Sequence, residues 1–156
     1  MFKTIDHFDS SAIDAMAASR QISSVGDAST DPRPTVLFAD ADPQYRETYD
    51  WLLRSYGFEV TVAGTGLECL ERLYHRVPDL LVLDMEMPWG GGEGVLRAIR
   101  REPWLLPGRV VLTLLREYSC GREERRRPAW IRHLYKPFSL WGLMQLASIE
   151  ELIPAL

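Results

Sequence analysis

The sequence predicts an α/β fold built on a doubly wound, five-stranded parallel sheet with strand order 2-1-3-4-5. From residue 35 onward, short apolar runs alternate five times with segments of helical periodicity, which is typical of successive βα units. The run Leu80–Leu83 is continuously apolar, as in a strand that is buried on both faces. The 156-residue chain, with 46% hydrophobic and 26% charged residues, has the length and composition of one globular domain.

The first unit begins with the apolar run Val36–Ala39, which ends at Asp40. Pro43 suits the first turn of the helix that follows, and Gly57 supplies its stop. Between them, large side chains recur at helical spacing: Tyr45, Tyr49, Leu52, Leu53 and Tyr56. We therefore expect the first strand and the first helix of the sheet here.

The second and third units repeat this order. Phe58–Val62 alternates like a strand, and a helical pattern follows until Pro78 closes it. Leu80–Leu83 is a continuous apolar run, and it ends at Asp84. A loop with three glycines then leads to a third helix. The apolar residues of that helix are Val95, Leu96 and Ile99.

The last two units are expected in the remaining part of the chain. Val110–Leu112 is a fourth strand, which we expect to end at Thr113. The strongly charged segment 116–127 is a candidate fourth helix. Ile131–Tyr135 is a fifth strand that ends at Lys136. The final helix is marked by Leu140, Leu143, Met144 and Ala147.

Residues 1–34 are expected to form an N-terminal extension and linker, and residues 35–156 the folded domain. The segment 23–34 is dense in Ser, Gly, Asp and Pro, which is typical of linkers. Residues 10–20 could form a short helix ahead of it.

Composition and charge narrow the function classes. The net charge of −4 is too small to favour nucleic acid or a membrane as partner. The chain begins without the apolar segment of a signal peptide, and no apolar run approaches the roughly 20 residues that span a bilayer. Cys69 and Cys120 lack metal-ligand spacing and are interpreted as reduced thiols. Together these features predict a cytoplasmic protein.

Four polar residues stand at the ends of the predicted strands: Asp40, Asp84, Thr113 and Lys136. The carboxyl ends of parallel strands share one edge of the sheet, and in this strand order the first and third strands flank the switch point where ligands bind. Two neighbouring carboxylates repel each other unless a cation such as Mg²⁺ joins them. With an ammonium and a hydroxyl as donors, this edge could serve phosphoryl transfer to a carboxylate.

These motifs resemble the receiver domains of bacterial response regulators, of the chemotaxis-regulator type. Asp84-Met85-Glu86-Met87-Pro88, followed by Gly92, resembles their phosphorylation loop. Lys136-Pro137-Phe138 resembles their Lys-Pro-Phe, in which the peptide bond before proline is typically cis. The run that ends at Asp40 resembles their first strand. The resemblance covers about residues 35–150 and implies a flavodoxin-like fold.

The resemblance implies a role for each site residue. Asp84 would accept a phosphoryl group from a sensor histidine kinase or a phosphotransfer protein. Mg²⁺ would be held by Asp40, the Asp84 carboxylate and the backbone carbonyl of Glu86. Thr113 and Lys136 would contact the phosphoryl group. The domain would then be a two-component signalling module, a phosphoprotein rather than an enzyme.

The output implied by the resemblance is a population shift on the face built from segments 116–127, 131–135 and 140–147. A downstream protein partner would read this face, or a second copy of the chain would form a homodimer through it. Nucleic acid is not an expected partner, because nothing like a helix-turn-helix remains outside the receiver.

The sequence also departs from the family pattern. Ala41 stands where the second of two adjacent acids is usual, so one metal ligand is missing unless Asp42 or Glu86 replaces it; Asp42 also suits a helix cap. Leu114 stands where a small residue is usual and could narrow access to the acyl phosphate. His133 takes the position of the switch aromatic, either in that role or as an ordinary strand residue.

Three functions therefore stay open. The first is a working phosphoacceptor receiver. The second is a degenerate pseudo-receiver, a phosphorylation-independent binding or dimerisation module, which Ala41 and Leu114 favour. The third is a phosphatase, because Asp40-Ala41-Asp42 resembles the Asp-x-Asp motif of haloacid-dehalogenase-type enzymes. That third reading leaves the pattern from Asp84 to Gly92 unexplained.

Overall fold

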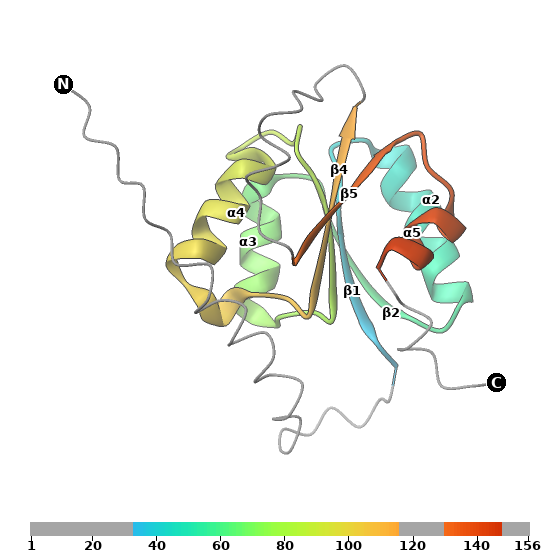
Figure 1. The fold of residues 1–156 in the computed structure, drawn as a ribbon, viewed down its shortest axis with the longest axis horizontal. Helices are drawn as coiled ribbons and strands as arrows, with labels where there is room; N and C mark the ends of the chain where they lie inside the picture. The colour runs from blue at the N-terminus through green and yellow to red at the C-terminus, as the bar shows by residue number, and fades with distance from the viewer. Residues whose placement is uncertain (1–32, 116–129, 148–156) are drawn as a thin grey trace.

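A computed structural model describes residues 33–115 and 130–147 of the chain. Within them, five parallel strands form one sheet in the order β2-β1-β3-β4-β5, which confirms the predicted doubly wound topology (Figure 1). The strands are β1 (Thr35–Ala39), β2 (Glu59–Ala63), β3 (Leu80–Asp84), β4 (Arg109–Leu115) and β5 (Ile131–Lys136). The helices are α2 (Pro43–Ser55), α3 (Gly66–His75), α4 (Gly91–Arg101) and α5 (Leu140–Leu146), with a 3-10 turn, η1 (Pro103–Leu105).

The helices cover the two faces of the sheet in pairs. α3 and α4 lie on one face, and α2 and α5 on the other (Figure 1). The central strand β3 supplies both cores: Leu81 and Leu83 pack toward α3 and α4, whereas Leu80 and Val82 pack toward α2 and α5. This double burial explains why the β3 sequence is apolar without alternation.

Polar caps fix where three of the helices begin. The Asp42 carboxylate accepts a hydrogen bond from the Gln44 backbone N–H (2.8 Å), the Thr65 hydroxyl from Glu68 N–H (3.1 Å), and the Ser139 hydroxyl from Gly142 N–H (3.1 Å). α4 begins differently, after Gly90 in a left-handed conformation (φ 93°). Each cap therefore fixes where the loop that leaves the carboxyl edge of the sheet ends and the next helix begins.

The positions of several elements differ from the sequence-based expectation. β2 covers Glu59–Ala63 rather than Phe58–Val62, and Phe58 instead packs fully buried before the strand begins. β4 continues through Leu115, so the prediction that Thr113 ends this strand is wrong. The reason is that β5 extends to Lys136 and gives the last two residues of β4 ladder partners. The expected helix at 116–127 and the expectations for residues 1–32 lie outside the described residues.

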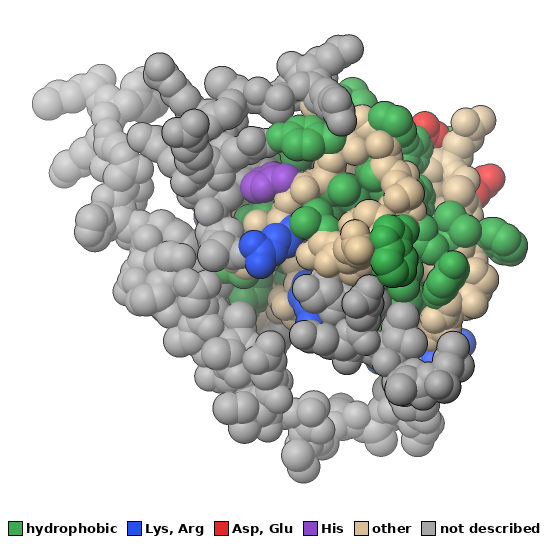
Figure 2. Space-filling view, turned by 45° about the vertical axis from the view of Figure 1, so that its right-hand side comes forward, with side chains coloured by type: hydrophobic (Ala, Val, Ile, Leu, Met, Phe, Trp, Pro, Cys, Tyr) green, Lys and Arg blue, Asp and Glu red, His purple; other side chains and the backbone are tan. Residues whose placement is uncertain are grey.

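Hydrophobic side chains also reach the surface. Figure 2 views the molecule from the side that carries α2 and α5, and green side chains are visible at several separate places. By solvent exposure, Trp51 of α2 (69% exposed) and Trp141 of α5 (60%) are large hydrophobic side chains at the surface. Within the described residues, none of the helices has both the length and the hydropathy that a bilayer crossing would need.

The close packing of the loop after β3 generates a prediction. A Cβ on Gly92 would lie 2.8 Å from the Asp84 carbonyl oxygen and the Met85 Cα, so we expect Gly92→Ala to destabilise the domain by about 1–3 kcal/mol. Gly94, two residues further along α4, has nothing within 4 Å of its Cβ position. Gly94→Ala should therefore stabilise the domain by up to about 1 kcal/mol. Urea denaturation measures both, and equal effects would contradict the packing argument.

Candidate functional site

Three charged side chains from three strands meet at the carboxyl edge of the sheet. Asp40 directly follows β1, Asp84 ends β3 and Lys136 ends β5. The Lys136 Nζ lies 2.7 Å from Asp40 Oδ2 and 3.0 Å from Asp84 Oδ2. β1 and β3 are hydrogen-bonded neighbours, whereas Lys136 reaches the carboxylates from beyond β4. The topological switch point thus brings two acids and one base into direct contact.

Burial sets the electrostatics of this group. The exposed fractions of the Asp40, Asp84 and Lys136 side chains are 1%, 5% and 10%. Burial raises the pKa of Asp40, although Lys136 and the Asp42 amide favour its ionised form. For Lys136, burial works to lower the pKa, but hydrogen bonds and charge from the two carboxylates outweigh it, so this pKa is raised. The single ammonium therefore offsets part of the charge of the two buried carboxylates.

Backbone amides provide further donors to the carboxylates. Asp40 Oδ1 accepts from the Asp42 N–H (2.9 Å), and Asp84 Oδ1 accepts from the Glu86 N–H (3.0 Å). Asp84 Oδ2 also lies at the limit of a hydrogen bond from the Ala41 N–H (3.5 Å). Both turns after the strands are thereby tied to the acids, which holds the carboxylates in fixed orientations.

A cavity of about 350 Å³ opens in front of this group. Asp40, Asp84 and Lys136 line it together with Ala41, Tyr45 and Glu86. It is large enough to admit several water-sized groups. A reactant could therefore approach Asp84 at this edge of the sheet.

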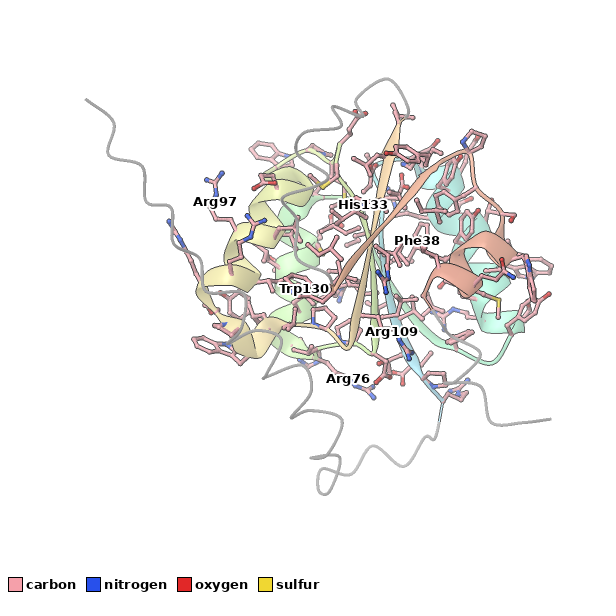
Figure 3. The ribbon with its side chains drawn as sticks, in the orientation of Figure 1. Phe38, Arg76, Arg97, Arg109, Trp130 and His133 are labelled. Atoms are coloured by element: carbon pink, nitrogen blue, oxygen red, sulfur yellow. The ribbon has the colours of Figure 1, made fainter. Side chains whose placement is uncertain are left out.

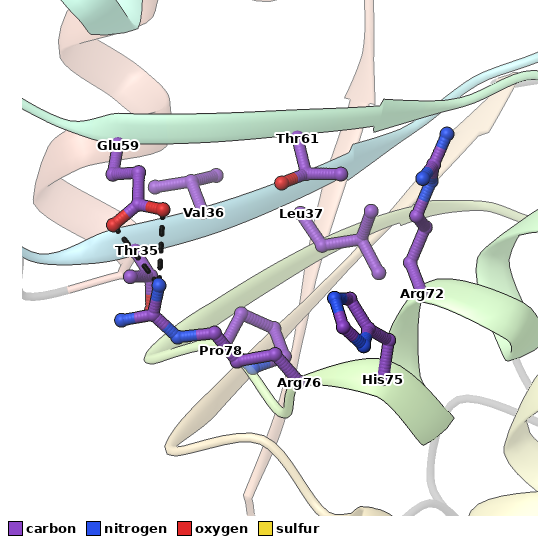
Figure 4. A pocket seen from close by; sticks show the side chains of 9 residues that line it. All are labelled: Thr35, Val36, Leu37, Glu59, Thr61, Arg72, His75, Arg76 and Pro78. Carbon is purple, nitrogen blue, oxygen red and sulfur yellow. Dashed lines mark hydrogen bonds and ion pairs between the residues drawn. The ribbon is translucent and has the colours of Figure 1, made fainter. Parts of the chain in front are cut away.

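A second cavity, of about 250 Å³, lies between α3 and the strands β1 and β2, and includes Thr35 at the start of β1 (Figure 4). Arg76 spans part of it by donating to both carboxylate oxygens of Glu59 (3.0 and 3.1 Å). Its remaining basic residues, Arg72 and His75, belong to the last turn of α3, where cations complement the helix dipole. We therefore place the candidate site at the carboxyl edge.

Thr113 is fully buried beside Asp84. The two residues are paired in register across β3 and β4, and the Met85 N–H donates to the Thr113 carbonyl (3.2 Å). Among the described residues, the Thr113 hydroxyl has no hydrogen-bond partner. A buried hydroxyl without a partner costs free energy unless it gains an acceptor in another state of the site.

The structure places the residues that depart from the family pattern in different surroundings. Asp42 is exposed and its carboxylate caps α2. Leu114 is buried among the residues facing α3 and α4. His133 is half-buried on β5, and Figure 3 shows it on the side of the sheet opposite Phe38. The Lys136–Pro137 peptide bond is cis, as the resemblance implied.

The structure offers few candidate ligands for the metal ion that the sequence led us to expect. Across residues 33–115 and 130–147, no group of three His, Cys, Asp or Glu side chains is arranged to hold a metal ion. Asp40, Asp42, Asp84 and Glu86 bring oxygen atoms to the cavity lining, and of these the Asp42 carboxylate also caps α2. Hard oxygen donors of this kind fit Mg²⁺, which commonly binds through one or two carboxylates and keeps several waters.

Two site residues were not recognised from the sequence. Tyr45 entered only as an apolar helix position, yet the Lys136 Nζ lies 5.0 Å from its ring centroid. Arg46 donates from Nη1 to the carbonyls of Asp40 (2.7 Å) and Ala41 (2.9 Å) and so braces the turn after β1. The available signal was their place in the first turn of the helix that follows the strand-end acid.

A doubly wound sheet with a buried acid–lysine group at its switch point defines a class of α/β signalling modules, and comparison with known proteins agrees. The model of the response regulator receiver domain matches residues 36–147. The chain belongs to this family, which serves two-component signalling.

Individual relatives show the same likeness. The transcriptional activator protein PfeR of Pseudomonas aeruginosa is 34% identical over 113 residues, which cover 70% of this chain and 35% of PfeR. The probable transcriptional regulatory protein TcrX of Mycobacterium tuberculosis is 36% identical over 106 residues, covering 68% of this chain and 44% of TcrX. The chain thus spans less than half of either relative.

Among solved structures, the Francisella response regulator 1452 receiver domain superposes with a TM-score of 0.66 at 25% identity. The match covers 78% of this chain and 97% of that domain. The described residues therefore share the fold of a receiver domain.

The buried ion group generates a prediction. Lys136→Met leaves two buried carboxylates without a cation, and we expect a loss of about 3 kcal/mol in the free energy of unfolding near neutral pH. The loss should shrink toward about pH 5, because the acid with the raised pKa, Asp40, becomes protonated more readily once the ammonium is gone. Urea denaturation at the two pH values measures this.

The sign of the pH effect follows from the direction of the shift. A carboxyl whose folded pKa is raised binds more protons when folded, so stability falls as pH rises through the window above its ordinary value of 3.8. Adding Asp40→Asn to Lys136→Met removes one of the two charges and should restore part of the stability. A loss that is independent of pH would contradict this account.

Proposed function

We propose that this receiver accepts a phosphoryl group on Asp84. The observation that carries the proposal is the position of the Asp84 carboxylate, which faces the 350 Å³ cavity while Lys136 contacts its Oδ2. An oxygen of Asp84 attacks the phosphorus of a phosphohistidine, the O–P bond forms, and the P–N bond breaks. The histidine nitrogen keeps the electron pair, and Asp84 becomes an acyl phosphate.

Donors around the cavity support this transfer. Lys136 already contacts the Asp84 carboxylate and can follow a phosphoryl oxygen as charge moves outward. The Thr113 hydroxyl, buried beside Asp84 and without a partner among the described residues, would gain an acceptor in a phosphoryl oxygen. Asp84, Lys136 and Thr113 are thus the phosphoacceptor and the phosphoryl-contacting residues that we propose.

Mg²⁺ completes the proposed site. Asp40, the Asp84 carboxylate and the backbone carbonyl of Glu86 would hold it. The ion would offset negative charge on the phosphoryl oxygens during transfer. Because Ala41 has no carboxylate and Asp42 caps α2, we expect a weaker magnesium site than one with an additional acid.

The partners follow from this chemistry. The phosphoryl donor would be a sensor histidine kinase or a phosphotransfer protein, and the output a shift in population between two conformations. A downstream protein, or a second copy of the chain, would read the shift at β5, α5 and the segment 116–127, which lies outside the described residues. We propose protein contacts in the cytoplasm, rather than nucleic acid or a membrane, as the output of this domain.

A second candidate function has its own support. Lys136 contacts both Asp40 and Asp84 and offsets part of their charge, and Ala41 removes an acid that would otherwise draw a metal ion. Such a site could stay in one state and serve as a pseudo-receiver that binds its partner without phosphorylation. Phosphorylation of the purified protein separates the two functions.

The proposed function predicts the outcome of this experiment. Incubation with Mg²⁺ and acetyl phosphate should add one phosphoryl group to the intact mass of the protein, and Asp84→Ala should abolish the gain. Folded protein that gains nothing, beside a labelled control receiver, would favour the pseudo-receiver. A label that maps to Asp40 instead would support the phosphatase reading.

The metal set generates a further prediction. Ala41→Asp adds a carboxylate at the cavity wall and should lower the Kd for Mg²⁺ by about tenfold or more, because affinity rises with ligand charge. Asp42→Ser keeps a helix cap while it removes a charge, and should leave the Kd for Mg²⁺ nearly unchanged if Asp42 only caps α2. Calorimetric titration measures both. A large loss of affinity in Asp42→Ser would make Asp42 a ligand.

A further inference from the structure

The ammonium of Lys136 has three N–H groups, and the two carboxylates account for only part of its surroundings. It lies 2.7 Å from Asp40 Oδ2 and 3.0 Å from Asp84 Oδ2, and its Nζ is 5.0 Å from the ring centroid of Tyr45. An aromatic face within about 6 Å attracts a cation through the ring quadrupole. Tyr45 therefore contributes a third electron-rich surface around the ammonium.

The Tyr45 ring is itself held in place. It stacks on Tyr49 (centroids 5.9 Å apart, planes at 16°) and meets Phe138 at a tilt (5.9 Å, 56°). Tyr49 in turn stacks on Phe38 of β1 (5.0 Å, 9°), and its hydroxyl donates to the Phe138 carbonyl (2.6 Å). These four rings join α2, β1 and the loop after Lys136 into one aromatic cluster, which restricts where the ring of Tyr45 can lie.

The same ring also borders the reaction space. Tyr45 lines the cavity together with the two carboxylates and Lys136. Ala41, on the same wall, supplies no charge there. A ring face can stabilise the ammonium without adding a negative charge that would repel a phosphoryl group.

We propose that Tyr45 is a positioning residue, whose ring face keeps the Lys136 ammonium directed at Asp40 and Asp84. Its importance for phosphoryl transfer rests on the function proposed above, whereas the contact with Lys136 does not. Tyr45 acts through Lys136 and not on the reactant itself. Removing the ring should let the long lysine side chain sample other directions and slow transfer to Asp84.

The chain offers a direct way to observe this contact, because Lys3 and Lys136 are its only lysines. Protein grown with isotope-labelled lysine gives two sets of side-chain NMR signals, and Lys136→Arg assigns them. A ring above the ammonium shifts the neighbouring ε-methylene protons upfield, so the Lys136 signal should lie upfield of the Lys3 signal. Lys3 serves as the internal reference.

Three variants test the proposal. Tyr45→Phe keeps the ring face and should keep the upfield shift, whereas Tyr45→Leu should move the Lys136 signal toward that of Lys3. Trp51→Leu removes another aromatic from the same helix, at a 69% exposed position, and should change nothing. An unchanged Lys136 signal in Tyr45→Leu, or the loss of the shift in Tyr45→Phe, overturns the proposal.

The initial rate of phosphorylation by acetyl phosphate supplies the second readout. We expect it to fall about fivefold in Tyr45→Leu, in keeping with the strength of a partly buried cation–π contact, and to stay near the wild-type rate in Tyr45→Phe. Equal rates in wild-type and Tyr45→Leu protein would refute the positioning role. Wild-type protein that takes no phosphoryl group would refute the proposed function, while the lysine spectra still decide whether Tyr45 holds Lys136.

Discussion

The contact of one buried ammonium with two buried carboxylates is the interaction on which the arrangement of the site depends. Asp40 and Asp84 stand at the ends of neighbouring strands, where their charges would repel each other with little water to screen them. Lys136 relieves this repulsion from the end of β5, beyond β4. Because its members lie at the ends of β1, β3 and β5, the group forms only when these strands are aligned with β4 between β3 and β5. The geometry of the site therefore depends directly on the arrangement of the strands.

The rest of the domain supports this contact from two directions. Apolar clusters on both faces of the sheet, each anchored on β3, hold the strands in register and so fix where the acids lie. Around the cavity, short polar contacts hold the loops: the Asp42 cap on α2, the amides of Asp42 and Glu86 on the carboxylates, and Arg46 on the turn after β1. On the α2 side, the aromatic cluster that includes Tyr45 borders the ammonium itself.

The departures from the family pattern have unequal consequences. Ala41 removes a possible metal ligand, and the Asp42 carboxylate, although it borders the cavity, is engaged in capping α2. Leu114 is accommodated in the core between the sheet and the helices α3 and α4. Asp84, Thr113 and Lys136, by contrast, lie together at the carboxyl edge: Asp84 and Thr113 are paired in register, and Lys136 contacts Asp84. The choice between a working receiver and a pseudo-receiver therefore depends on the oxygen donors available to a metal ion more than on the phosphoacceptor residue.

Much of the fold could be predicted from the sequence, because burial leaves a local pattern. The apolar run of β3 reflects a strand buried on both faces, and the helical spacing of large side chains in α2 reflects a helix with one face against a core. The strand-end positions of Asp40, Asp84 and Lys136 follow from the same local pattern. What the sequence could not determine depends on contacts between distant segments. The end of β4 was misjudged at Thr113 because ladder partners on β5 extend the strand, and the role of Asp42 was open because a cap and a ligand have the same sequence signature. The place of Tyr45 over Lys136 joins residues 91 positions apart, and only the packing of α2 against the loop after β5 brings them together.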